Sequence, residues 1–152
     1  MSLSLKDVEL RVGAEVHVHP TGLDLQAGGF NVLLGPTLAG KTTLLRLMAG
    51  LLRPTAGRVW FGGRDVTGVP VRERRVAMVY QQFINYPHLS VFENIASPLR
   101  VARVPAPEVR TRVGRIAEVL RLGPLLDRRP SELSGGQQQR AALARALVKE
   151  AD

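Results

Sequence analysis

The stretch Gly35-Pro36-Thr37-Leu38-Ala39-Gly40-Lys41-Thr42-Thr43 decides the fold of this chain. Its spacing, Gly-x-x-x-x-Gly-Lys-Thr, is that of a phosphate-binding P-loop. An apolar run over residues 30–34 precedes it and predicts a buried strand, and an apolar stretch over residues 44–50 follows it and predicts a helix. Strand, glycine-bounded loop and helix, in this order, predict a nucleotide-binding site.

The residue types in the loop explain this prediction chemically. Gly35 and Gly40 allow the backbone to turn tightly, so that its N–H groups converge on an anion at the positive end of the helix. Lys41 is the cation expected to contact the β- and γ-phosphates, and the Thr42 hydroxyl is expected to bind Mg²⁺. The other residues of the expected cradle are Pro36, Thr37, Leu38, Ala39 and Thr43. The alternative, a turn that matches by chance, does not explain the flanking strand and helix.

Composition places the chain among globular domains. It has 152 residues, 45% of them hydrophobic, which is enough for one domain with a core of its own. No apolar run approaches the ~18 residues of a spanning helix, and the first residues lack the pattern of a signal peptide. Cysteine is absent, which excludes disulfides and thiolate metal sites. A cytosolic chain is the simplest interpretation.

The net charge of +8 raises the question of a nucleic-acid partner. The arginines are dispersed, and the two short clusters at residues 72–75 and 127–129 each contain an acid. Aromatic residues, which single-stranded nucleic-acid sites interleave with cations, make up only 5% of the chain. A solvated basic surface is therefore the preferred interpretation, and no nucleic-acid partner is expected.

Strand patterns flank the loop on both sides. Apolar and polar residues alternate over residues 3–25, with a turn expected at 20–22, and an apolar run at 76–80 predicts another buried strand. That run ends at Gln81. Ligands of open α/β sheets bind at the carboxyl ends of strands, so the Gln81 amide is a candidate to contact the metal or the attacking water. The alternative is a surface glutamine at a strand end.

The helical period dominates from residue 90 onwards. Ser90 to Glu93 resemble a capping box, and a second helix is expected to open at Pro105 and Pro107. Leu133-Ser134-Gly135-Gly136-Gln137 then precedes an alanine-rich helix over residues 141–149. A small hydroxyl and two glycines at a helix start predict a second phosphate-binding element. Alone, this element could equally be a helix N-cap and nothing more.

In combination, these motifs resemble the ATP-binding subunit of ABC transporters over nearly the whole chain. Residues 35–43 resemble the Walker A motif, Gln81 the Q-loop glutamine, and Ser134, Gly135, Gly136 and Gln137 the family signature. The resemblance implies ATP and Mg²⁺ as ligands, with Lys41 and Gln81 in catalytic roles and Thr42 and Gln81 at the metal. It also implies that the signature binds the γ-phosphate of ATP held by a second subunit in a head-to-tail dimer.

The resemblance implies an α/β fold. We expect a P-loop NTPase core, a mixed sheet with an antiparallel N-terminal β-subdomain, together with an α-helical subdomain, in truncated form. The whole chain, residues 1–152, would be one incomplete ATP-binding domain. Its expected parts are the β-subdomain and P-loop core at 1–85, the Q-loop and helical subdomain with the signature at 86–140, and the following helix at 141–152.

The segment from Tyr86 to Ile95 narrows the resemblance. It is similar to the corresponding segment of importers of sugars, polyols and glycerol phosphate, and Leu38 and Ala39 resemble a branch linked to glycerol or similar polyols. The implied partners are a second ATP-binding subunit, transmembrane permease subunits and, indirectly, a solute-binding protein. The implied location is peripheral, on the cytoplasmic face of the inner membrane.

Two departures from the family pattern stand out. No aromatic residue lies around Arg11-Val12-Gly13 to stack on adenine, and His17 is the candidate substitute. The family also continues after the signature helix with an apolar strand ending in Asp-Glu, a D-loop and a switch histidine, whereas this chain ends at Asp152. We therefore expect an N-terminal fragment that binds ATP and hydrolyses it only as part of the full-length subunit.

Two other functions remain open on the sequence. One is a soluble ABC-type ATPase that acts on nucleic acid or ribosomes, although such proteins usually carry two cassettes and no internal repeat is present here. The other is a non-catalytic nucleotide-binding fragment. Import driven by ATP remains the leading hypothesis, because the basic charge is the only feature that favours the nucleic-acid alternative.

Overall fold

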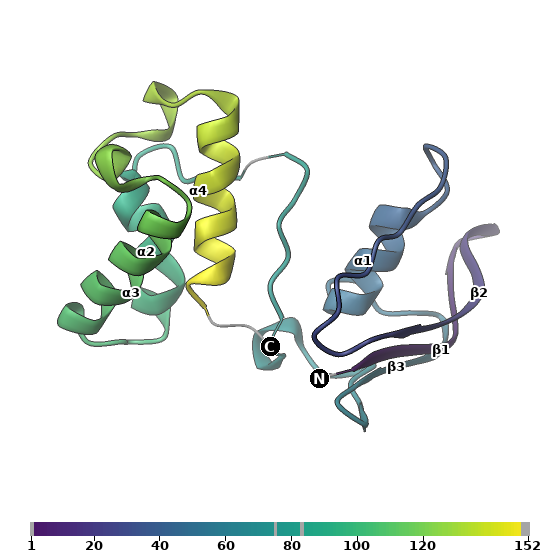
Figure 1. Ribbon diagram of the computed structural model, residues 1–152. Helices are drawn as coiled ribbons and strands as arrows, with labels where there is room; N and C mark the ends of the chain where they lie inside the picture. Colours follow the sequence, from purple (N-terminus) through teal and green to yellow (C-terminus); the bar gives the residue numbers. More distant parts are fainter. Residues whose placement is uncertain (1, 75, 83, 150–152) are drawn as a thin grey trace. The chain divides into compact units, whose positions relative to one another are not determined.

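The computed structural model describes residues 2–74, 76–82 and 84–149. The chain divides into two compact units, residues 1–76 and residues 77–151. Figure 1 shows a sheet with one helix in the first unit and a group of three α-helices in the second. No helix among the described residues is long and apolar enough to cross a bilayer.

The first unit is built on an antiparallel sheet. Its strands are β1 (Leu3–Val12), β2 (Glu15–Leu25), β3 (Ala56–Phe61) and β4 (Arg64–Asp65), in the spatial order β2-β1-β3-β4. The alternation predicted for residues 3–12 is confirmed, since Leu5, Val8 and Leu10 are buried while their polar neighbours are exposed or half-buried. The antiparallel β-subdomain is therefore present.

Helix α1 (Lys41–Ala49) packs on this sheet (Figure 1). Leu44, Leu47 and Met48 recur at helical spacing on one face of α1 and are all buried. They share one core with buried residues of the strands, namely Leu5, Val8, Leu10, Val18 and Val59. Because burial of one such side chain stabilises a fold by roughly 1.5–3 kcal/mol, this face fixes the helix that follows the P-loop.

A buried arginine holds the C-terminal end of α1. Gly50 ends the helix in the left-handed region, at φ +76°, and an added Cβ there would lie 2.3 Å from the Arg74 guanidinium carbon. Arg74 donates to the carbonyl oxygens of Met48 at 3.2 Å and Val69 at 2.9 Å, and also to that of Val66. A cation is favourable at a helix C-terminus, although burial lowers the pKa of Arg74.

Three local predictions differ from the structure. Residues 30–34 and 76–80, expected as buried strands, belong to no strand of the described chain. Phe30 and Leu34 are 95% and 84% exposed. Strands that are apolar on both faces need neighbours on both sides, and the described residues provide none for these runs. The turn expected at residues 20–22 is instead part of β2, where pairing with β1 shifts in register between Val8 and Leu10.

The second unit consists of α2 (Val91–Val101), α3 (Ala106–Val119) and α4 (Gly135–Leu147), with short 3₁₀ turns at Gly123–Leu125 and Pro130–Glu132. The expected N-cap is confirmed, because the Ser90 hydroxyl accepts from Glu93 N. One core joins the three helices; its fully buried members include Val91, Ile95, Val109, Val113 and Ala144. The helical subdomain thus has a hydrophobic core of its own.

Two glycines allow a test of the sheet geometry. An added Cβ at Gly57 (φ +78°) would lie 2.1 Å from the Asp7 carbonyl oxygen, whereas one at Gly63 (φ +77°) would meet nothing within 4 Å. Both alanine variants suffer the same backbone strain, of about 1–2 kcal/mol. Gly57→Ala should lose about 1–3 kcal/mol more than Gly63→Ala, because it adds a steric overlap. Urea unfolding followed by Trp60 fluorescence measures this difference, and equal losses would contradict the close approach of β1 and β3.

Candidate nucleotide-binding site

The P-loop curls directly into the start of α1. Gly40 precedes the helix in the left-handed region, at φ +77°, and its carbonyl oxygen accepts from Leu44 N at 2.8 Å. Leu38, at φ +68°, also lies in this region, which is unusual for a residue with a side chain. Two left-handed residues within three positions bend the loop back towards the helix N-terminus, where the first-turn N–H groups lack intrahelical acceptors.

The Lys41 side chain folds back into this loop. Its Nζ donates to the carbonyl oxygen of Gly35 at 2.8 Å and to that of Pro36 at 2.5 Å. Hydrogen bonds from an ammonium group are shorter and stronger than those between neutral groups. The loop backbone therefore holds the positive charge of Lys41 beside Gly35 and Pro36, at the start of the loop.

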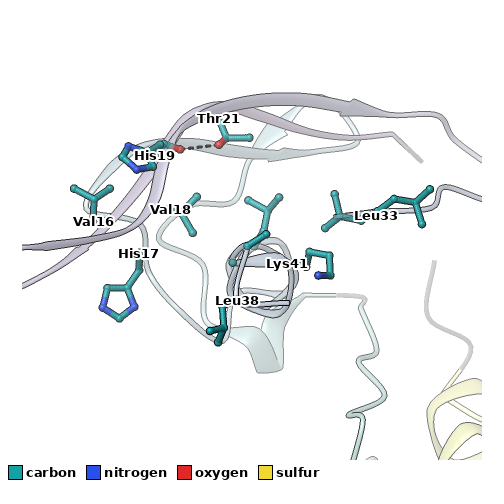
Figure 2. Close-up of a pocket in the computed structure, with 12 residues that line it drawn as sticks. Val16, His17, Val18, His19, Thr21, Leu33, Leu38 and Lys41 are labelled. Carbon is teal, nitrogen blue, oxygen red and sulfur yellow. Dashed lines mark hydrogen bonds between the residues drawn. The ribbon is translucent and has the colours of Figure 1, made fainter. Parts of the chain in front are cut away.

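A cavity of about 420 Å³ lies beside the loop (Figure 2). β2 provides one wall, through residues 16–19 and Thr21, and the loop and α1 provide another, through Leu38, Ala39, Gly40, Lys41 and Leu44. The loop packs closely on β2, since an added Cβ at Gly40 would lie 3.1 Å from the His17 carbonyl oxygen. The cavity is thus continuous with the P-loop and large enough for part of a small organic ligand.

His17 is one of the residues that line this cavity. Its side chain is 43% exposed, and its Nε2 lies 3.7 Å from Glu15 Oε2. Figure 2 shows His17 and Leu38 near one another beside the N-terminal end of α1. No group of three or more His, Asp or Glu residues among the described residues is arranged to hold a metal ion. The first strands thus place a planar side chain beside the loop, although they carry no aromatic residue at 11–13.

The signature residues form the N-terminus of α4. The Ser134 hydroxyl accepts from Gln137 N at 3.4 Å, and Gln137 Oε1 accepts from Ser134 N at 2.8 Å. This is a complete capping box. The N-cap alternative from the sequence is therefore realised, and a phosphate-binding role for the same residues remains a prediction. Ser134, Gly135 and Gly136 are all exposed.

The structure brings only some of the predicted site residues together. Residues 35–43 form one site in the first unit, together with the cavity lined by His17. Gln81 and residues 134–137 belong to the second unit, where Gln81 is an exposed residue in a bend. The metal and catalytic roles of Gln81 and Thr42 therefore stay predictions.

Sequence reasoning missed four polar residues with structural contacts. They are Arg74, Asn85, Asn94 and Arg145, all of which donate to backbone carbonyl oxygens far from them in sequence or across a loop. Only Asn94 could have been found from the sequence, because helical spacing puts it on the same face as Val91 and Ile95. In the structure it is 1% exposed. A polar side chain on an apolar face must find partners when it is buried.

Comparison with known proteins decides the family. Residues 18–152 match the family described as ABC transporter. The chain belongs to the ABC transporter family. Membership implies a nucleotide-binding domain, so the P-loop, the capped signature helix and the α/β class now have one explanation. Similar proteins, which are import ATP-binding proteins, also confirm the expected resemblance to the ATP-binding subunits of importers.

Three curated relatives of this ABC domain are import proteins. The chain is 47% identical over 148 residues to an sn-glycerol-3-phosphate import ATP-binding protein of Rhizobium johnstonii, covering 97% of this chain and 40% of the relative. It is 48% identical to a spermidine/putrescine import ATP-binding protein of Acidothermus cellulolyticus, covering 96% and 39%. It is 44% identical to a trehalose/maltose import ATP-binding protein of Thermococcus litoralis, covering 95% and 41%. The chain thus spans about 40% of the length of these relatives.

A solved ABC structure supports the fold class. It is a dimeric ATP-binding cassette in a post-hydrolysis state, bound to ADP and Pi, which matches with a TM-score of 0.87 at 30% identity. The match covers 97% of this chain and 70% of that one. The expected α/β P-loop NTPase class is confirmed, although two of the strands expected in the core are not formed among the described residues.

The capping box at the signature generates a stability prediction. We expect Ser134→Ala to destabilise the chain by about 1 kcal/mol, because the Gln137 N–H loses its acceptor. Ser134→Asp keeps a side-chain oxygen at the N-cap, so it should retain the wild-type stability. Thermal unfolding followed by far-ultraviolet circular dichroism compares the two variants. A Ser134→Ala variant as stable as wild type would show that the box does not stabilise α4.

Proposed function

We propose that this domain binds ATP and, within the full-length subunit, hydrolyses it to power solute import of the sugar, polyol or glycerol-phosphate type. The observation that carries the proposal is the P-loop in which the Lys41 ammonium lies beside the N-terminus of α1. A cation and free helix N–H groups together favour a polyphosphate over other anions. The import class comes from the relatives, whose names describe import ATP-binding proteins.

Lys41 changes partners when ATP binds, in this proposal. Its ammonium leaves the carbonyl oxygens of Gly35 and Pro36 and contacts the β- and γ-phosphates. The phosphates accept from N–H groups of residues 37–43. A phosphate oxygen is a stronger acceptor than a peptide carbonyl because it carries charge, and this difference drives the exchange.

Thr42 and Gln81 are the proposed ligands of Mg²⁺. A hydroxyl and an amide oxygen are hard donors of the kind that Mg²⁺ accepts, with water and phosphate oxygens completing its shell. The ion neutralises charge that develops on the phosphates during transfer. Gln81 is also proposed to orient the attacking water.

The cavity beside His17 is the proposed site for the nucleoside. Its wall of β2 residues and its continuity with the loop support a position for base and ribose next to phosphates bound at Lys41. The His17 imidazole is planar and half-exposed, so it can stack on adenine in the role of the missing aromatic residue.

The signature is proposed to act in a dimer. Ser134, Gly135, Gly136 and Gln137 would contact the γ-phosphate of ATP bound to a second ATP-binding subunit. The dimeric assembly of the similar cassette supports this arrangement. Permease subunits and, indirectly, a solute-binding protein are the remaining proposed partners, and the cytoplasmic face of the inner membrane is the proposed location.

The test of ATP binding is Lys41→Ala. Removing the cation over the phosphates should weaken Mg-ATP binding by about tenfold or more, because hydrogen bonds to charged groups contribute about 1.5–3 kcal/mol. Lys6→Ala is the control, since it removes the same charge from β1, where Lys6 lies 4.8 Å from the Trp60 ring. Isothermal titration of both variants measures the affinities. Unchanged ATP affinity in Lys41→Ala would refute the P-loop role.

His17 gives a separate test of the nucleoside site. We expect His17→Ala to weaken ATP binding by about threefold to tenfold, the loss of one stacking contact of roughly 0.5–1.5 kcal/mol. Binding of inorganic tripolyphosphate should not change, because that ligand has no base. Competition titrations with both ligands make the comparison. Equal weakening of both would place His17 in the phosphate site or the fold and not beside the base.

A further inference from the structure

We propose that Arg145, Asn85 and Asn94 anchor residues 84–86 to helices α2 and α4, and thereby position Gln81 relative to the signature end of α4. Residues 84–86 are called the anchored segment here. The anchoring stands on contacts within the second unit alone. Its consequence for ATP rests on the proposed role of Gln81.

Arg145 contacts the anchored segment at two points. Its Nη2 donates to the Ile84 carbonyl oxygen, and its guanidinium carbon lies 5.1 Å from the centroid of the Tyr86 ring. A planar guanidinium can donate in its plane and stack through its face at the same time, which a lysine ammonium cannot do. One side chain of α4 therefore restrains both ends of the segment.

Two asparagines complete the attachment. Asn85 Nδ2 donates to the Gln138 carbonyl oxygen on α4 at 3.1 Å. The side-chain amide of Asn94, on α2, bonds both the backbone N–H and the carbonyl oxygen of Tyr86. Its Oδ1 accepts from Tyr86 N at 2.7 Å, and its Nδ2 donates to the Tyr86 carbonyl oxygen at 3.0 Å. The same Nδ2 also donates to the carbonyl oxygens of Leu89 and Ser90. Because Asn94 is 1% exposed, loss of the bond from Tyr86 N would leave its Oδ1 buried without a partner, at about 1–3 kcal/mol.

The anchored segment limits the position of Gln81. Only two residues, 82 and 83, separate Gln81 from Ile84, and the three fully extended residue steps between them span at most about 11 Å. Helix α4, which holds Ile84 and Asn85, begins directly after Ser134. A displacement of Gln81 beyond the reach of this short tether must therefore move α4 and the signature residues or break the contacts of Arg145.

This arrangement gives Arg145 a positioning role. A ligand that draws Gln81 towards it applies force to the N-terminal part of the anchored segment, and α4 receives that force through Arg145 and Gln138. The role is separable from the general stability of the helices.

The chain offers a matched control for this role. Arg140 is also on α4, and its Nη1 donates to the Leu120 carbonyl oxygen at 3.0 Å. Arg140→Ala therefore removes one guanidinium–carbonyl contact from the same helix without touching the anchored segment. Arg145→Lys is the conservative variant, which keeps the charge over Tyr86 but not the planar geometry.

A distance measurement on the 152-residue chain tests the anchoring without nucleotide. The chain has no cysteine, so Gln82→Cys and Leu147→Cys introduce unique label sites at exposed positions. Double electron–electron resonance measures the distribution of distances between two spin labels attached at these cysteines. This distribution should be narrow, with a single maximum, in the otherwise unaltered chain and in Arg140→Ala. We expect a clearly broader distance distribution in Arg145→Ala than in the parent. The distribution in Arg145→Lys should have a width between these two, and circular dichroism should show unchanged helix content in all variants. A distribution in Arg145→Ala as narrow as in the parent would overturn the proposal.

A double-mutant cycle tests the link to ATP. Gln81→Ala and Arg145→Ala should each weaken the Mg²⁺-dependent part of ATP binding severalfold, and the double variant should be no weaker than Gln81→Ala alone. Additive losses would show that Arg145 acts independently of Gln81 and would overturn its positioning role. A Gln81→Ala variant with wild-type affinity would instead refute the proposed role of Gln81, while the distance measurement would still decide the anchoring.

Discussion

The attachment of Lys41 at the start of α1 is the constraint on which the first unit depends. The helix must present its N-terminus to the P-loop, and it is fixed for this purpose along its length. Leu44 and Leu47 bury its inner face against the sheet, and Arg74 binds the carbonyl oxygen of Met48 at its other end. The bonds from Lys41 to the loop carbonyl oxygens fix only the position of the lysine side chain. The packing of Leu44 and Leu47 and the bond from Arg74 are needed as well to fix the direction of the helix axis, and with it the helix dipole.

The features that sequence predicted well are those set by neighbouring residues. Helix α1 follows from its apolar period and from Gly50, and the N-caps at Ser90 and Ser134 follow from a hydroxyl three residues before the N–H that it accepts from. Such contacts close within one turn of helix, so the local pattern determines them. The turn of the P-loop into α1 belongs to the same class at Gly40, whereas the left-handed Leu38 and the absence of a strand at residues 30–34 do not follow from the local pattern.

The features that sequence predicted poorly depend on distant partners. The run at residues 30–34 has the composition of a buried strand, but a strand forms only where another strand accepts its backbone hydrogen bonds. The contacts of Arg74 and Arg145 are invisible for a related reason. Their acceptors are backbone carbonyls, which every residue carries, so no residue type at any spacing marks them.

The packing of the second unit does not explain why residue 136 of the signature is a glycine. An added Cβ at Gly136 would meet nothing within 4 Å, and its backbone is helical, so an alanine would be accommodated there. The capping box uses the Gln137 N–H, which leaves the first-turn N–H groups of Gly135 and Gly136 outside the box. A cap of this kind fixes the helix start without occupying the groups that an anion would bind. Under the proposed function, the partner that approaches α4 from outside explains Gly136. A phosphate held by a second subunit would leave no room for a side chain at this position, although the fold of the second unit would accommodate one.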